Sequence, residues 1–148
     1  MKTTPWIWLC IASLLLVSCS APRHALLNVA YTSEELADFI WKFKDSHPDG
    51  FTLSLSTLTE PSEGISAAYY SSSMVLDKDG LETVVSHSLA HDGHVGGWFS
   101  SKDSLYYIDS VRLFPENKRN KALRFARRNK QDAVYVISTS EEIWVRYD

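Results

Sequence analysis

The stretch "VGGWFSSKDSLYYIDSVRLF", Val95–Phe114, decides the fold class. Two runs rich in aromatic and β-branched residues stand on either side of the polar "SKD", which is typical of two strands joined by a short turn. A hairpin requires its two strands to pair antiparallel. The stretch therefore predicts an antiparallel sheet.

Helical patterns lie on both sides of this hairpin. Residues 32–47 begin with the capping-box pair Thr32 and Glu35 and continue with apolar residues at helical spacing. Residues 77–91 carry a second apolar stripe, and residues 115–129 begin with a proline, as a helix start often does. Three helices are therefore expected.

Strand patterns fill the remaining sequence. The segment "FTLSLS" alternates apolar and polar residues, and three further runs are bounded by turn residues. The expected strands are 51–56, 65–73, the two arms of the central hairpin, 133–138 and 142–147. The order α-ββ-α-ββ-α-ββ predicts an α+β fold, in which about three helices pack on one face of a largely antiparallel sheet of hairpins.

The C-terminal part of this pattern matches a recurring arrangement. It contains a Gly-Gly-Trp strand, a Tyr/Asp/Ser/Arg strand, a helix with alanines and the corner "NKQDA" before the next strand. About the last 55 residues of the 148 thereby resemble a small α+β module of bacterial and phage-borne proteins. That module has no established activity, so the resemblance implies a fold and no catalytic residue.

The N-terminus has the pattern of a secretory signal. One basic residue, Lys2, precedes the uncharged run Trp6–Val17, which is too short to cross a bilayer comfortably. The run ends in Leu16-Val17-Ser18-Cys19, which resembles the lipobox of bacterial lipoproteins. The resemblance implies cleavage between Ser18 and Cys19 and acylation of the Cys19 thiol.

Processing at this bond would divide the chain into three parts. Residues 1–18 would be the signal peptide, 19–31 a lipidated N-terminus and tether, and 32–148 a single α+β domain. The residue after the cysteine is Ser20 and not aspartate. If the host is Gram-negative, this resembles the pattern of lipoproteins that are sorted to the outer membrane. The chain has two cysteines, Cys10 and Cys19, so the mature domain is expected to contain neither a free thiol nor a disulfide.

Charge is unevenly distributed. The chain has 15 basic and 18 acidic residues, yet Lys118 to Lys130 contains seven basic residues and no acidic one. Such a helix is either a solvated cationic face or a surface that binds anions. The candidate partner-binding residues share this segment: Arg119, Lys121, Arg124, Arg127, Arg128 and Lys130.

Three histidines form the alternative site. His87 and His91 are four residues apart on the second predicted helix, and His94 follows it, so three imidazoles could bind zinc. However, the glutamate of a His-Glu-x-x-His protease is absent, because residue 88 is serine. The positions of His87 and His91 relative to the apolar stripe instead indicate two solvent-facing side chains.

Two further features favour structural roles. Asp109 and Arg112 are three residues apart on a predicted strand, which places them on opposite faces unless a bulge intervenes. Gly96 and Gly97 open no helix, so they indicate a bulge or a tight entry into a strand and not a phosphate loop.

These features predict a lipid-anchored envelope binding protein without catalytic activity or cofactor. Its partners would be the membrane, through Cys19, and a protein, in the manner of an inhibitor, immunity or exclusion factor. An extracytoplasmic location disfavours nucleic acid. One alternative is a small metal-dependent hydrolase using His87, His91 and His94. The other is a structural envelope lipoprotein with its basic face on anionic lipid or cell wall.

Overall fold

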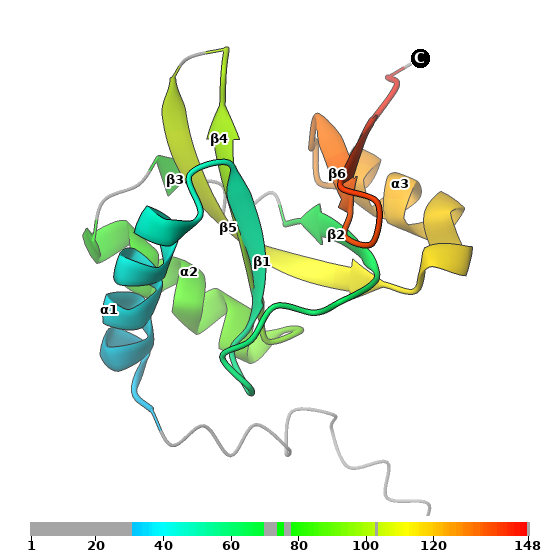
Figure 1. Ribbon diagram of the computed structural model, residues 1–148. Coiled ribbons are helices and arrows are strands. Elements are labelled where there is room, and N and C mark those ends of the chain that lie inside the picture. Colours follow the sequence, from blue (N-terminus) through cyan, green and yellow to red (C-terminus); the bar gives the residue numbers. More distant parts are fainter. Residues whose placement is uncertain (1–30, 70–73, 76–77, 103, 148) are drawn as a thin grey trace, which may run out of the picture.

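The computed structural model describes residues 31–69, 74–75, 78–102 and 104–147 (Figure 1). The predicted signal peptide, the lipobox and nearly all of the predicted tether lie outside these residues. No helix in the described part of the chain is long and apolar enough to cross a membrane.

The described elements confirm the α+β class. The three α-helices are α1 (Ser33–Phe43), α2 (Lys78–Ala90) and α3 (Arg119–Arg128), and single 3-10 turns cover Lys44–Ser46 and Glu116–Lys118. The strands are β1 (Gly50–Ser54), β2 (Ile65–Ala68), β3 (Met74–Val75), β4 (His94–Ser100), β5 (Leu105–Phe114), β6 (Ala133–Val136) and β7 (Glu141–Trp144). Each predicted helix is therefore present.

Helix α1 begins where the capping box predicts. The Glu35 amide donates to Thr32 Oγ1 over 3.2 Å, and the Thr32 amide donates back to Glu35 Oε2 over 2.7 Å. These two bonds satisfy amides that a helix start leaves without partners. Leu36 and Ile40 then lie on the buried side of the helix.

The sheet is antiparallel throughout. Six strands are ordered β1-β4-β5-β2-β6-β7. Strand β3 also pairs with β5, nearer the start of β5 than the residues that pair with β2. The predicted hairpin is present in regular register, with Ser100 opposite Leu105 and His94 opposite Val111. Strand β5 is ten residues long and pairs with three other strands.

The first two predicted strands do not form a hairpin with each other. Strand β1 pairs with β4, and β2 pairs with β5 and β6. The segment between them, residues 55–64, turns at Ser54–Thr59 and leads the chain away from β1. Strand β2 is therefore inserted between two strands that come much later in the sequence.

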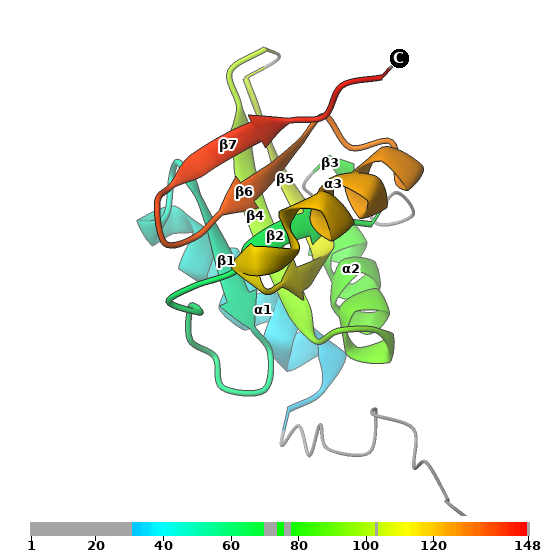
Figure 2. The same ribbon diagram turned by 90° about the vertical axis from the view of Figure 1, so that its right-hand side faces the viewer.

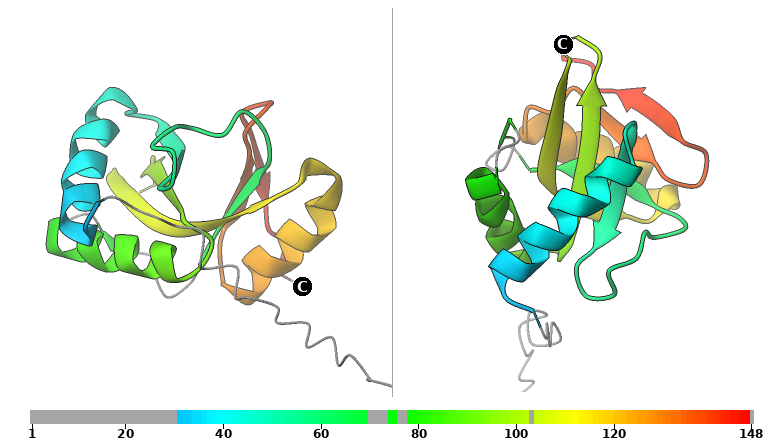
Figure 3. Two further views of the ribbon diagram at one scale, coloured as in Figure 1. Left: turned by 90° about the horizontal axis from the view of Figure 1, so that it is seen from below. Right: turned by 60° about the vertical axis from the view of Figure 1, so that its left-hand side comes forward.

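All three helices cover one face of this sheet, over two separate cores. One core lies between α1, α2 and the half of the sheet formed by β1, β4 and the start of β5; it includes Leu53, Val85 and Ile108. The other lies between α3, β2, β6 and β7 and includes Ile65 and Phe125. Figure 3 shows the two groups of helices at opposite ends of β5.

The helix-free face of the sheet is curled. Strands β4 and β7 are separated by β5, β2 and β6, so in a flat sheet they would be roughly 19 Å apart at ordinary strand spacing. Yet Trp98 Nε1 on β4 donates to Glu142 Oε1 on β7 over 3.3 Å. The sheet must bend toward its open face to allow this contact.

The two glycines of the hairpin allow close packing. Gly96 and Gly97 pair regularly with β1 and β5, so the predicted bulge or tight strand entry is wrong. A Cβ atom on Gly97 would lie 2.4 Å from Cε1 of the Phe51 ring and 2.8 Å from the Tyr106 hydroxyl. Glycine is required there because an aromatic ring occupies the space of a side chain.

Candidate functional site

Helix α3 is orientated by a narrow apolar stripe. Ala122, Phe125 and Ala126 are buried against β2 and β6, while the basic residues of the helix are exposed. Lys121, Arg124 and Arg128 follow one another at intervals of three and four residues, so they lie on one side of the helix. We call these three residues the basic face.

Other cations of the predicted set make contacts within the protein. Arg119 Nη2 lies 3.3 Å from Glu141 Oε1 in a half-exposed ion pair, and Arg127 Nε donates to the Arg146 carbonyl over 3.1 Å. The ion pairs found among the described residues include none to the basic face. Lys130 is exposed just beyond the helix end and adopts a positive φ of 54°.

A second polar group lies where the two cores meet. Arg112 Nε donates to Asp92 Oδ2 over 2.9 Å, and the Tyr69 hydroxyl donates to the same oxygen. The Arg112 guanidinium carbon lies 5.1 Å from the centre of the Phe125 ring and 5.7 Å from that of Tyr69. We call Tyr69, Asp92, Arg112 and Phe125 the Arg112 cluster.

This cluster joins elements from both cores. Asp92 follows α2, Phe125 belongs to α3, and Arg112 stands on β5 between them. Burial, and then the hydrogen bond to Asp92, raise the pKa of Tyr69, so the phenol stays protonated and donating. The polar groups of the cluster therefore bond to one another, and the cluster is a structural link between the two cores.

The predicted separation of Asp109 and Arg112 is confirmed. Their strand pairs with β4 without a bulge, so the two side chains lie on opposite faces. Arg112 takes Asp92 as its acidic partner instead. Asp92 and Tyr69 are site residues that sequence reasoning missed, because their approach depends on the distant pairing of β2 with β5.

The two helical histidines stack on each other, with ring centres 3.9 Å apart. The His91 ring is exposed and its Nδ1 bonds to the His87 carbonyl over 2.7 Å. His87 is half-buried against Tyr69, so its predicted solvent-facing position is wrong. The prediction failed because the apolar stripe of α2 marks only the side that packs on the sheet, whereas Tyr69 contacts His87 from the side of α3. Burial, and then the charge of His91, lower the pKa of His87.

The third histidine does not complete a metal site. His94 begins β4 and its Nδ1 bonds to the Asp92 carbonyl over 2.7 Å. Within the described residues, no three His, Cys, Asp or Glu side chains are close enough to hold a metal ion. The geometry therefore does not support the zinc-hydrolase hypothesis.

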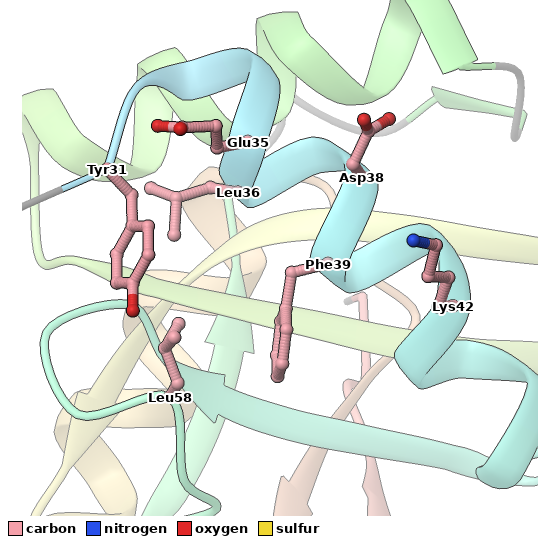
Figure 4. A pocket seen from close by; sticks show the side chains of 7 residues that line it. All are labelled: Tyr31, Glu35, Leu36, Asp38, Phe39, Lys42 and Leu58. Atoms are coloured by element: carbon pink, nitrogen blue, oxygen red, sulfur yellow. The ribbon is translucent and has the colours of Figure 1, made fainter.

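An open depression lies along α1 (Figure 4). It has a volume of about 410 Å³ and is lined by Tyr31, Glu35, Leu36, Asp38, Phe39, Lys42 and Leu58. Asp38 and Phe39 leave the helix on opposite sides, and Phe39 points down beside the hollow. The carboxylates of Glu35 and Asp38 and the Lys42 ammonium thus line this depression together with apolar side chains.

No protein-family model matches the chain, and comparisons with curated proteins and with solved structures give no match.

Proposed function

We propose that this chain is a non-catalytic binding protein of the bacterial envelope, anchored by lipid on Cys19, that engages a protein partner through the basic face. The observation that carries the binding proposal is the exposure of Lys121, Arg124 and Arg128 on one side of α3. Three cations without an ion pair among the described residues favour an acidic surface on the partner.

The position of α3 supports this proposal. Its buried residues fix it on the sheet, so the three side chains leave a rigid element. Charged side chains on a rigid element lose less freedom on binding than those on a loop. The lipobox resemblance supports the anchor, and a chain attached by two or more acyl groups stays at the bilayer.

The anchor is tested on the full-length chain produced in a bacterial host. Mass spectrometry of the N-terminal peptide is expected to show Cys19 as the first residue, with added acyl mass. A Cys19→Ser variant should leave the membrane fraction. An unmodified Cys19, or a serine variant that still fractionates with membranes, would contradict the anchor.

Binding is tested by crosslinking in the envelope followed by purification of the tagged chain. We expect a protein species that the triple variant Lys121→Glu, Arg124→Glu, Arg128→Glu loses. The matched control reverses Lys42 and Lys102, two exposed lysines outside α3. Retention of the species by the triple variant would remove the basic face from the proposal.

A second arm separates protein from lipid. The full-length chain with Cys19→Ser is mixed with vesicles of neutral or anionic phospholipid at low and high salt. Salt-sensitive binding to anionic vesicles that depends on the basic face would instead favour a structural lipoprotein lying on the membrane surface.

A further inference from the structure

The helix-free face of the sheet carries exposed aromatic side chains at its β7 end. Figure 2 shows β7 beside β6 at the end of the sheet, and Tyr135 on β6 is directly opposite Glu142 on β7. Trp144 is on the same face two residues further on, and it is 62% exposed. Trp98 reaches this group from β4 and is 39% exposed.

These residues surround one carboxylate. Glu142 Oε1 accepts from Trp98 Nε1, so the acidic group is held beside one indole. Residues opposite each other on paired strands have Cβ atoms about 5 Å apart, and residues two apart on one strand are about 7 Å apart. Tyr135 and Trp144 are therefore both near Glu142. We call this group the β4–β7 patch: Trp98, Tyr135, Glu142 and Trp144.

The charge of this face is acidic. By strand alternation and register, Asp109 and Glu142 are on the helix-free side, and none of the residues that the described strands place there is lysine or arginine. The neighbouring Glu141 lies on the other side of β7 and pairs with Arg119 of α3. The patch is thus complementary to a cation, whereas the basic face is complementary to an anion.

Aromatic rings around a carboxylate suit an organic cation. An ammonium or guanidinium over the face of tryptophan is attracted by the ring quadrupole, and a carboxylate adds a charged hydrogen bond. An anionic lipid headgroup would meet Glu142 with like charge. The chemistry of the patch therefore favours a lysine or arginine side chain.

The backbone beside the patch favours an extended peptide. Strand β7 is the last strand of the sheet, and no described residue pairs with its outer edge. An outer edge offers amide and carbonyl groups to an added strand. A segment paired there would place alternate side chains on the helix-free face, next to Trp144.

We propose that the β4–β7 patch binds a lysine or arginine side chain of an extended partner segment that adds to the edge of β7. The proposal concerns a surface other than the basic face and stands without it.

The test is a titration observed on tryptophan indole signals by NMR. The full-length ¹⁵N-labelled chain in non-ionic detergent is titrated with a blocked peptide of alternating lysine and threonine. The indole signals of Trp98 and Trp144 should move saturably, with a dissociation constant on the order of 1 mM, while that of Trp41 on α1 stays in place. The same peptide with glutamate in place of lysine should move none of them.

Two adjacent glutamates provide a matched pair of variants. Glu142→Gln should weaken peptide binding about fivefold, because it removes the carboxylate and keeps the shape. Glu141→Gln on the opposite side of β7 should leave binding unchanged. Trp144→Ala should abolish saturation, and an unchanged amide spectrum for α1 and β1 would show that this variant is folded.

Several results would overturn the proposal. Indole signals of Trp98 and Trp144 that stay in place up to about 10 mM peptide would do so. So would equal weakening by Glu141→Gln and Glu142→Gln. A response to choline chloride stronger than the response to the lysine peptide would assign the patch to a lipid headgroup. A response to an uncharged oligosaccharide that Glu142→Gln leaves intact would assign it to a glycan.

Discussion

The two halves of the sheet are built with unequal cores. Among the described residues, the half under α1 and α2 buries eleven in its core, one of them alanine. The half under α3 buries eight, and three of these are Ala67, Ala122 and Ala126. Because apolar burial is the main source of stability, the α3 half depends more on its neighbour. Yet the basic face is on this smaller half, and the β4–β7 patch joins β6 and β7 of the smaller half to Trp98 of the larger one.

The comparison predicts that the α3 half opens first. Phe125 fills much of its core and also contacts Arg112, so Phe125→Ala should cost about 3–5 kcal/mol. Hydrogen exchange should then show α3, β6 and β7 losing protection while β1 and β4 keep more of theirs. For contrast, Leu53→Ala should lower protection across the whole chain. Uniform loss in both variants would mean that the halves unfold as one unit.

The larger core is expected to be intolerant of added volume. Gly97→Ala places a methyl group against the Phe51 ring, so we expect a loss of about 1–3 kcal/mol in denaturant unfolding. Ser101→Ala, at an exposed turn of the same hairpin, is the control and should change little. A Gly97→Ala protein as stable as the parent would show that Phe51 can move away freely.

The Arg112 cluster, which links the halves, is expected to contribute less to the free energy of unfolding than either core. Arg112→Met keeps much of the side-chain volume but takes one partner from Asp92, and we expect a loss of about 1–2 kcal/mol, because both side chains are partly exposed. The double variant with Asp92→Asn should lose less than the sum of the single variants. Additive losses would indicate that the Arg112 cluster does not couple the halves.

His87 packs on Tyr69 of the Arg112 cluster, so the free energy of unfolding should depend on the protonation of His87. Its pKa is lowered in the folded protein, so the unfolded chain binds the proton more readily. Above the ordinary histidine pKa of the unfolded chain, the stability contributed by neutral His87 is fully present. It declines as the pH falls from that value toward the lowered pKa of His87 in the folded protein. Denaturant unfolding at several pH values should show the decline in the parent and a smaller one in His87→Gln. Equal slopes would exclude a role for His87.

The smallest effect is expected at the basic face. The triple reversal of Lys121, Arg124 and Arg128 should change the free energy of unfolding by about 0.5 kcal/mol or less, because these side chains are exposed. A thermal unfolding curve of the purified variant measures this. A large loss would mean that the cations stabilise α3, and the binding experiment would then need single substitutions.

The sequence predicts local structure here better than distant contacts. Thr32 and Glu35 mark the start of α1 because a capping box involves four consecutive residues. The polar "SKD" between two strand patterns likewise predicts the β4–β5 hairpin. The expected pairing of the first two strands is wrong, since a strand pattern shows which residues are buried and does not identify the neighbouring strand.

The candidate sites show the same limit. The exposure of the α3 cations follows from helical spacing alone. In contrast, Tyr69 meets Asp92, and Trp98 meets Glu142, across 23 and 44 residues of sequence. Those meetings depend on the order of strands and on the curl of the sheet, which no local pattern contains.

The position of β2 in the sheet determines when the α3 half can fold during synthesis. Both of its neighbours, β5 and β6, follow it in the chain, so a growing polypeptide holds Ile65–Ala68 without a sheet partner until Phe114 has been synthesised. Its second partner arrives only at Val136. Assembly of the α3 half must therefore wait for nearly the whole chain, and a product truncated before β6 would expose Ile65 and Ala67 to aggregation or proteolysis.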